Sequence, residues 1–440
     1  MSSQPTNHAE AVNEASAAYR LQAGKAALLR PGYKMTEVGV IPEDWSVKSV
    51  IEIGQIKTGP FGTLLKASEY SDNEGVPLIS VGEVGEGSFC VTDRTPQIPK
   101  NVVRRLPQYV LRSGDIVFGR KGAVNRSALV SPAEDGWFLG SDGISIRPNN
   151  KCYPPYLAAQ FQSRTVQSWL VQNAIGTTMP SLNQGILSRV LIPYASEVEQ
   201  RAIAAALSDV DALLDGLERL IAKKRDLKQA AMQQLLTGQT RLPGFSGEWE
   251  VKRLGGLAEL NRINVIPASR PDQLFVHFSL PAFDEEKGPQ IEHGSAIGSN
   301  KFRVPPDAVM VSKLNPRIPR IWAPVNVPQN SCASTEWLVL TPREGIGRTF
   351  LYVICSSPAF YQQMALAATG TTGSHQRISP ITALDILVSA PVDREEQTAI
   401  ATILSDMDAE LAALEARRDK TRALKQGMMQ ELLTGKTRLL

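Results

Sequence analysis

Few residues in this 440-residue chain stand in a pattern that could carry out a reaction. Asp115, followed by Arg120 and Lys121, could suggest a nuclease-like cluster, but the usual set of spaced carboxylates with a lysine is not recognisable. The second half offers only Asp307 and Lys313 in the corresponding place. The chain also lacks an evident Ser/His/Asp grouping and the H-E-x-x-H pattern of zinc proteases. Catalysis is therefore the weaker hypothesis.

Two short motifs resemble catalytic signatures but lack a required residue. Residues 435–437, Gly-Lys-Thr, resemble the end of a phosphate-binding loop, yet Gln430 stands where the motif needs glycine. Residues 153–156, Tyr-Pro-Pro-Tyr, resemble the Asn-Pro-Pro-Tyr signature of adenine methyltransferases, but the asparagine is missing. We interpret the proline pair as the start of a helix, where proline is well tolerated.

The composition is that of an ordinary globular protein of two or three domains. The net charge of +3 neither favours nor excludes nucleic acid. The four cysteines, Cys90, Cys152, Cys332 and Cys355, have no metal-ligand spacing and predict reduced thiols in a cytosolic protein. The sequence predicts neither a transmembrane helix nor a secretory signal, so we expect a cytoplasmic location.

The elements that must position any functional residue are dominated by a repeat. Segments Glu199–Leu242 and Glu396–Leu439 align without a gap, and more than half of the aligned positions are identical. Apolar residues recur in alternating steps of four and three residues, which is the seam of a coiled coil. They are Ile203, Leu207, Val210, Leu214, Leu217 and Ile221 in one copy, and Ile400, Leu404, Met407, Leu411 and Leu414 in the other.

The repeat predicts two helices that start after Pro193 and Pro391 and end at Gly238 and Gly435. Each would have about 40 residues and a length of about 60 Å. Two such seams in one chain are satisfied most simply if the helices pair antiparallel. A length of about 60 Å corresponds to about 17 base pairs of duplex.

The segments between the helices share a weaker pattern. Each opens with an acidic-Trp-x-Val-Lys element, at 44–48 and 248–252, and later has a strand carrying basic residues, at 115–121 and 307–313. Each also predicts one helix, over 156–174 and 350–368, followed by Gly-Thr-Thr. We therefore expect two related domains with irregular sheets and divergent loops.

The expected fold class is α+β. Two globular domains would be separated and joined by two long helices that form an antiparallel coiled coil, with a pseudo-two-fold internal repeat. The predicted segments are an N-terminal helical extension at 1–30, a first domain at 31–195, a first helix at 196–240, a second domain at 241–392 and a second helix at 393–440.

This layout resembles the specificity subunit of type I restriction-modification systems. The resemblance is carried by residues 32–45, by the Glu-Gln pairs that open the long helices at 199–200 and 396–397, and by their Leu-Leu-Thr-Gly ends. It covers nearly the whole chain from about residue 30.

The resemblance implies a non-catalytic DNA reader. Each globular domain would be a target recognition domain that reads one half of a bipartite site, and the conserved spacer helices would set the gap between the halves. The helices would also dock two methyltransferase subunits. These would bring S-adenosylmethionine, which this chain would not bind, and methylate adenine at N6. Restriction subunits that cut DNA could then join.

Duplex recognition needs cations for phosphates and planar polar groups for base edges. The DNA-binding candidates are Lys57, Lys66, Arg120, Lys121, Asn125, Arg126, Thr177, Thr178 and Asn183 in the first domain, and Lys313, Asn315, Arg317, Arg320, Thr371, Thr372, Ser374, His375, Gln376 and Arg377 in the second. The candidates for partner binding at the ends of the helices are Glu199, Gln200, Leu235, Leu236, Glu396, Gln397, Leu432 and Leu433. The alternatives are a self-contained DNA methyltransferase or nuclease, and a coiled-coil scaffold for two protein-binding domains.

Overall fold

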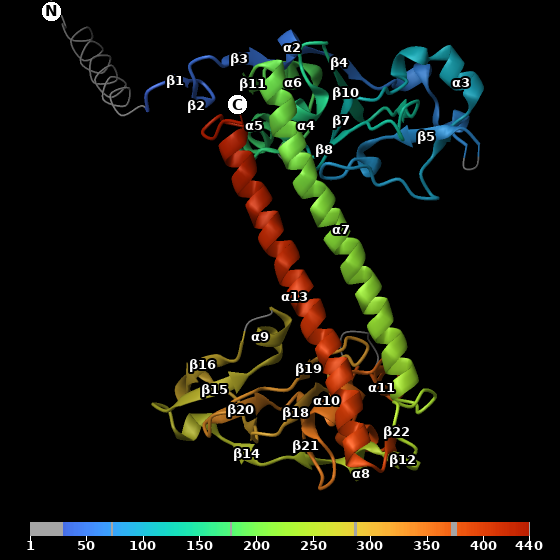
Figure 1. The fold of residues 1–440 in the computed structure, drawn as a ribbon, viewed down its shortest axis with the longest axis vertical. Helices are drawn as coiled ribbons and strands as arrows, with labels where there is room; N and C mark the ends of the chain where they lie inside the picture. The colour runs from blue at the N-terminus through green and yellow to red at the C-terminus, as the bar shows by residue number, and fades with distance from the viewer. Residues whose placement is uncertain (1–29, 72–73, 177, 286–287, 371–375, 440) are drawn as a thin grey trace, which may run out of the picture. The chain divides into compact units, whose positions relative to one another are not determined.

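The structure is a computed structural model that describes residues 30–71, 74–176, 178–285, 288–370 and 376–439. The chain divides into two compact units (Figure 1). Unit 1 comprises residues 1–215 and 419–440, and unit 2 comprises residues 216–418. The predicted helix within residues 1–30 lies outside the described residues. The predicted domain boundaries remain a prediction, because these units divide each long helix rather than separating it from the domains.

The main sheet of unit 1 has four antiparallel strands in the order β4-β10-β7-β8. They are β4 (Gly54–Thr58), β10 (Gly143–Pro148), β7 (Ile116–Gly119) and β8 (Ser127–Leu129). All four residues of β7 are buried, as its apolar run predicts for a central strand. Phe118 of this strand meets Phe161 edge to face, with ring centroids 4.8 Å apart, and so joins the sheet to the helices that cover it.

Smaller elements complete unit 1. A three-stranded sheet in the order β6-β5-β9 has its own apolar cluster, which includes Leu78, Ile98 and Phe138. Two-stranded ribbons pair β1 with β2 and β3 with β11. The bounds are β1 (Tyr33–Thr36), β2 (Gly39–Pro42), β3 (Ser46–Ser49), α2 (Val50–Ile53), β5 (Val76–Ile79), β6 (Gln97–Ile98), α3 (Lys100–Arg105), β9 (Phe138–Leu139), α4 (Pro154–Gln162), α5 (Arg164–Asn173), α6 (Gln184–Ser188) and β11 (Leu191–Tyr194).

Unit 2 repeats the frame of unit 1. Its four-stranded antiparallel sheet has the order β13-β21-β18-β19, and a two-stranded ribbon pairs β12 with β22. The bounds are β12 (Trp249–Arg253), α8 (Leu254–Leu257), β13 (Ala258–Asn261), β18 (Val309–Ser312), β19 (Ile321–Trp322), β21 (Trp337–Pro342), α10 (Arg348–Ser356), α11 (Pro358–Leu366), α12 (Pro380–Leu384) and β22 (Leu387–Pro391). The structure confirms two related α+β domains.

The two units differ in the part inserted into this frame. Unit 2 has a five-stranded sheet in the order β14-β17-β20-β15-β16 where unit 1 has three strands. The elements are β14 (Asn264–Val265), β15 (Leu274–Phe278), α9 (Leu280–Asp284), β16 (Gln290–His293), β17 (Lys301–Arg303) and β20 (Ser331–Ser334). The two domains therefore differ in the size and strand order of the inserted sheet as well as in their loops.

Each predicted domain helix is in fact two helices. Unit 1 breaks it between α4 and α5, and unit 2 breaks it between α10 and α11. A serine stands at each break: the Ser163 side chain accepts from the amide of Val166, and that of Ser357 accepts from the amide of Phe360. A serine that caps a new helix competes with continuation of the old one, which the apolar pattern alone could not reveal.

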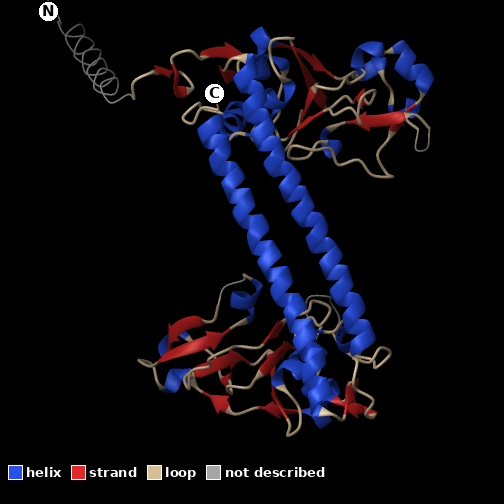
Figure 2. Cartoon of the chain, viewed as in Figure 1, coloured by secondary structure: helices blue, strands red, loops and turns tan. Residues whose placement is uncertain are grey.

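The two repeated segments form unbroken helices, α7 (Glu197–Leu235) and α13 (Arg394–Leu432) (Figure 2). Heptad residues of both are buried, including Ile203, Leu217, Ile400 and Leu404. The helices end at Leu235 and Leu432, shortly before the predicted Gly238 and Gly435. Both glycines have positive φ, 71° and 69°, as is common after the C-terminus of a helix.

The helices pair antiparallel within each unit. In unit 1, Lys425 of α13 contacts Asp211 of α7 at 2.5 Å. In unit 2, Lys224 contacts Glu410 at 2.7 Å, and Lys228, one turn further along α7, contacts Asp408, which lies earlier in α13. These pairs confirm the antiparallel direction. Within the described residues, no helix is long and apolar enough to cross a membrane.

Candidate nucleic-acid interface

Unit 1 joins two of the predicted DNA-binding segments directly. The loop between β7 and β8, residues 120–126, lies against the loop that leads into α6. Gly122 donates its amide to the carbonyl of Pro180 at 2.9 Å, and Leu182 donates to the carbonyl of Arg120 at 2.8 Å. Lys121 and Ser181 form an isolated antiparallel β-bridge between the two loops. Candidates that are about 60 positions apart in the sequence therefore share one surface.

Unit 2 makes the same junction with different residues. Its loop between β18 and β19, residues 313–320, lies against the segment that leads into α12. Asn315 donates its amide to the carbonyl of Gln376 at 2.7 Å, and Ile378 donates to that of Lys313 at 3.1 Å. Leu314 and Arg377 form the bridge that corresponds to Lys121 and Ser181. We call these two places the paired loops of unit 1 and unit 2.

Local backbone geometry explains why these loops turn where they do. Gly122 has φ of 74° and Asn315 has φ of 46°, both in the left-handed region. Glycine has no steric penalty there, and asparagine tolerates the region better than most residues. Pro316 and Pro319 restrict the rest of the unit 2 loop. The backbone hydrogen bonds between the paired loops thus do not depend on the side chains that the loops carry.

Three predicted arginines are the best placed for a DNA contact. Arg126 and Arg317 are exposed and Arg120 is half-buried. Within the described part of the chain, no side-chain partner is found for any of the three. Asn125 lies half-buried in the same loop as Arg120 and Arg126, and Lys313 lies half-buried in the unit 2 loop with Arg317. For these residues, contact with DNA stays a prediction.

Other candidates already have partners. Lys121 lies 3.1 Å from Asp142, and Arg377 lies 3.1 Å from Glu336, both as exposed pairs. Lys57 donates to the carbonyl of Gln108 at 3.0 Å and lies over the ring of Tyr109. The ion pairs of Lys121 and Arg377 are exposed and therefore weak. A DNA phosphate could replace the carboxylate in either pair.

Two further candidates make side-chain contacts within unit 1 or unit 2. Arg320 forms a two-pronged pair with Asp284, at 2.6 and 3.1 Å, and only 13% of its side chain is exposed. It therefore fastens the unit 2 loop to α9 instead of reaching out. Asn183 uses its side-chain oxygen to cap α6, accepting from Ile186 at 2.8 Å. Asparagine is a preferred N-cap residue, and because Asn183 is exposed, its contact with DNA stays a prediction.

The remaining DNA-binding candidates fall into two groups. Thr178 and Lys66 are exposed and Gln376 is half-buried, within the described residues. The other five candidates, Thr177, Thr371, Thr372, Ser374 and His375, lie outside the described residues.

The predicted partner-binding residues are mostly interior. Glu199, Gln200 and Glu396 are fully buried, and Gln397, Leu235, Leu432 and Leu433 are nearly so. Leu236 is half-buried. The Glu-Gln pairs satisfy polar groups of the chain's own domains, and partner binding by these eight residues stays a prediction. Gln200, for example, donates to Ala195 at 2.9 Å and accepts from Tyr153 at 2.8 Å.

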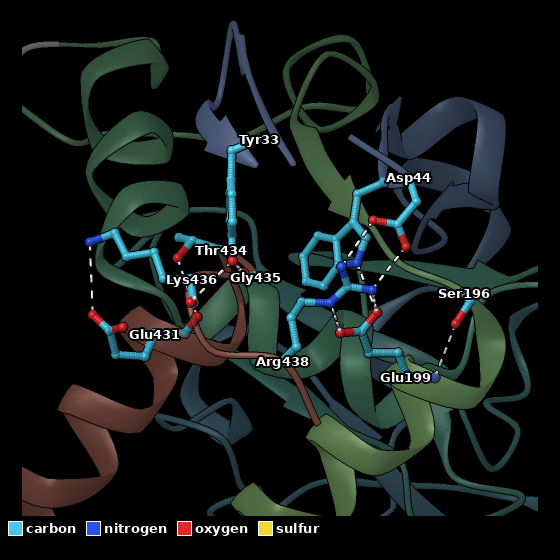
Figure 3. A network of polar contacts seen from close by, with 10 residues as sticks. Tyr33, Asp44, Ser196, Glu199, Glu431, Thr434, Gly435, Lys436 and Arg438 are labelled. Atoms are coloured by element: carbon cyan, nitrogen blue, oxygen red, sulfur yellow. Dashed lines mark hydrogen bonds and ion pairs between the residues drawn. The ribbon is translucent and has the colours of Figure 1, made fainter. Parts of the chain in front are cut away.

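Arg438, near the C-terminus, is the partner of Glu199. Its guanidinium contacts Glu199 at 2.5 and 2.9 Å and Asp44 at 2.8 and 2.9 Å (Figure 3). The indole of Trp45 donates to the same Glu199 at 2.8 Å. The hydrogen bonds that Arg438 donates to Glu199 and Asp44 raise the pKa of Arg438, and Arg438 in turn lowers the pKa of Asp44. We call this arrangement the Arg438 clamp.

Unit 2 has an equivalent clamp. Arg241 contacts Glu396 through two bonds of 2.6 Å, and the indole of Trp249 donates to Glu396 at 3.4 Å. Each clamp fixes the ribbon that opens a domain, β3 or β12, to the start of a long helix. Sequence reasoning missed both arginines, although Thr-Arg-Leu follows the glycine in both copies of the repeat.

Each unit also has a groove at the C-terminal end of a long helix. The groove of unit 1 has a volume of about 430 Å³ and is lined by Gln426, Met429, Gln430, Leu433 and Thr434 of the α13 segment. The groove of unit 2 has a volume of about 420 Å³. It is lined by the equivalent residues Gln229, Met232, Gln233, Leu236 and Thr237. The repeat has therefore duplicated one surface, with Ser163 or Ser357 on the domain side.

The residues first weighed for catalysis have structural roles. Asp115 is buried and pairs with Arg147 at 2.6 Å, while its other contact caps the amide of Arg112. Tyr156 is buried and donates to the carbonyl of Pro193 at 2.7 Å. The proline pair opens α4, as predicted. No cluster of three or more His, Cys, Asp or Glu residues suited to a metal is found among the described residues.

Comparison with known families places this architecture in a class. The family model for the type I restriction modification DNA specificity domain matches residues 42–225. That segment contains the four-stranded and three-stranded sheets of unit 1, its paired loops and the first part of α7. Residues 42–225 are therefore similar to type I restriction-modification DNA specificity domains.

Particular relatives are all named specificity subunits. The MjaVIII specificity subunit of Methanocaldococcus jannaschii is 28% identical over 231 residues, which is 50% of this chain and 52% of that protein. The MjaIX subunit of the same organism is 25% identical over 286 residues, 61% of this chain and 63% of that protein. The EcoBI subunit of Escherichia coli is 24% identical over 208 residues, 46% and 43% of the two chains. The chain thus spans less than two thirds of the curated relatives it matches.

Solved structures show that the fold is shared. The S subunit of the type I system of M. genitalium has a TM-score of 0.58 and 15% identity, and covers 92% of this chain and 99% of its own. A structure described for complex assembly and conformational transition of the type I R-M system has a TM-score of 0.53 and 19% identity, covering 90% and 99%. The predicted fold class is confirmed.

Proposed function

We propose that this chain is the non-catalytic DNA-recognition subunit of a type I restriction-modification complex. The domain in each unit reads one half of a bipartite site, and α7 and α13 set the spacing between the halves. The names of the matched relatives, all type I restriction enzyme specificity subunits, support this assignment.

The observation that carries the proposal is the duplicated pair of loops. Both units use the same sheet order and the same backbone junction, Lys121 with Ser181 and Leu314 with Arg377. The side chains presented on this common frame differ between the units. A constant frame with variable side chains suits two readers of different sequences.

The duplicated grooves suit two copies of one partner. We propose that one methyltransferase subunit docks at each groove, with S-adenosylmethionine bound by the methyltransferase and not by this chain. Those subunits would flip an adenine out of the duplex and methylate it at N6. Restriction subunits would join the same complex to cut DNA.

The alternative, a self-contained methyltransferase or nuclease, is not favoured. Its best sequence support was Asp115 and the segment 153–156. Asp115 is committed to Arg147, and Tyr156 is buried beneath Pro193. Neither group is placed to meet a substrate.

The test is to map methylated adenines in a genome that expresses the chain with its methyltransferase. We expect methylation at a split sequence with a fixed unread gap. Replacing the unit 2 domain by one from another specificity subunit should change one half of that sequence only. Methyl transfer by the isolated chain, or methylation without a split sequence, would contradict the proposal.

A further inference from the structure

A short hairpin in unit 1 exposes two large apolar side chains. Ile175 is 58% exposed and Met179 is 61% exposed. The hairpin is closed by two backbone hydrogen bonds between Ile175 and Ser181, of 3.0 and 2.8 Å. Ile175 and Met179 are thus two large apolar side chains that this hairpin presents to solvent.

This hairpin belongs to the paired loops. Ser181 bridges to Lys121, and Pro180 accepts the amide of Gly122 at 2.9 Å. The neighbouring loop supplies the cations Arg120, Lys121 and Arg126, against one acid, Asp142, which pairs with Lys121. An apolar tip beside surplus positive charge suits a partner that is anionic and carries exposed apolar groups.

Duplex DNA offers that combination in its major groove. Its phosphates are anionic, and thymine is the base that presents an apolar group there, the C5 methyl. Methionine adapts its shape easily to such a contact because its side chain is unbranched and flexible.

We propose that Ile175 and Met179 contact the C5 methyl group of a thymine in the half-site read by the unit 1 domain. This inference rests on the proposed DNA-reading function and assigns a base-specific contact to residues that a search for cations and amides overlooks. The hairpin would then contribute apolar base contacts beside the polar contacts made by the neighbouring loop.

The test compares thymine with deoxyuridine, which lacks only the C5 methyl. The full-length chain in complex with its methyltransferase binds duplexes carrying the mapped site, with each thymine of the unit 1 half replaced in turn. At one position wild type should bind about fourfold more weakly, the contribution of one buried methyl group. Met179→Ala should bind the thymine duplex more weakly and lose no further affinity on deoxyuridine.

The matched control is Met35→Ala, because Met35 is a methionine of unit 1 with 51% exposure on β1. It should keep the full preference for thymine. The proposal is overturned if no deoxyuridine position weakens wild type, or if both Ile175→Ala and Met179→Ala keep the preference. It is also overturned if these variants lose the methyltransferase on size exclusion, since the hairpin would then be a protein contact. Failure of wild type to bind the mapped duplex would count against the proposed function instead.

Discussion

At the scale of single residues, arginines of similar sequence context have opposite roles. Arg317 and Arg320 lie in the same loop, three positions apart. Arg317 is exposed, whereas Arg320 is locked to Asp284 and 13% exposed. The prolines and charges around them are equally suited to DNA. What separates them is the position of α9, which supplies the carboxylate.

Substitution should separate these roles. Arg317→Ala should weaken binding of the mapped site by about 1–3 kcal/mol if its guanidinium grips a guanine, and should leave stability unchanged. Arg320→Ala should lower the free energy of unfolding, because Asp284 loses its partner and the loop its anchor. Fluorescence anisotropy and urea denaturation measure the two effects. The interpretation fails if Arg317→Ala binds as tightly as wild type.

The Arg438 clamp gives a second prediction at this scale. Arg438→Ala leaves the buried Glu199 without its guanidinium, so unfolding of unit 1 should become easier by about 3 kcal/mol. Arg241→Ala is the matched change in unit 2. Hydrogen exchange resolves the two units, and equal protection of unit 1 in wild type and Arg438→Ala would refute the role of the clamp.

The clamp should also respond to pH. The folded pKa of Asp44 is depressed by Arg438, so its contribution is present above its unfolded pKa, near 3.8. It is lost as the pH falls through the folded pKa. The stability difference between wild type and Asp44→Asn should therefore shrink below about pH 4. A difference that stays constant down to pH 2 would argue against this ion pair.

At the scale of elements, different features of the sequence set the lengths of the long helices and of the domain helices. α7 and α13 run unbroken for 39 residues each because apolar residues follow heptad spacing and no breaker intervenes. The domain helices stop after nine residues, where Ser163 or Ser357 caps a new helix. Periodicity therefore predicts a long helix well, while a single cap decides where a short one ends.

The proposed spacing role of the helices can be tested by their length. Deleting one register-matched heptad from α7 and one from α13 keeps both seams and shortens each helix by about 10 Å. The gap between half-sites should shrink by about three base pairs, while the half-site sequences stay the same. Methylome mapping measures both. Altered half-sites with an unchanged gap would contradict the idea.

At the scale of the whole molecule, the internal repeat duplicates surfaces as well as elements. The grooves of the two units are lined by residues 197 positions apart, such as Gln233 and Gln430. The clamps are duplicated too, although Arg241 follows α7 directly and Arg438 lies near the C-terminus. The segment after α13 thus supplies the arginine of the unit 1 clamp, and the segment after α7 supplies the arginine of the unit 2 clamp.

Blocking one groove should therefore halve partner binding. Gln233→Trp places a bulky group in the unit 2 groove at an exposed position, so folding should be unaffected. We expect one methyltransferase per chain in place of two, and none when Gln430→Trp is added. Native mass spectrometry counts the subunits. Two methyltransferases bound to the double variant would show that they dock elsewhere.

The repeat, the two long helices with their ends, the α+β class and the family resemblance could all be predicted from the amino-acid sequence. These rest on local periodicity and on motif residues that the chain carries in order. It also placed Arg120, Lys313 and Arg317 at or after the ends of strands, because strand-to-loop transitions are marked by glycine, asparagine and proline.

Which candidate side chains remain exposed and unpaired depends on contacts that form only in the folded chain. Arg320 is structural because Asp284 lies within reach, and the buried Glu199 and Glu396 are paired with Arg438 and Arg241, which return to them. Hydrogen bonding and burial depend on neighbours distant in sequence. A single chain read in order gives residue types and local spacing, whereas the availability of a charged side chain is set by what the fold brings against it.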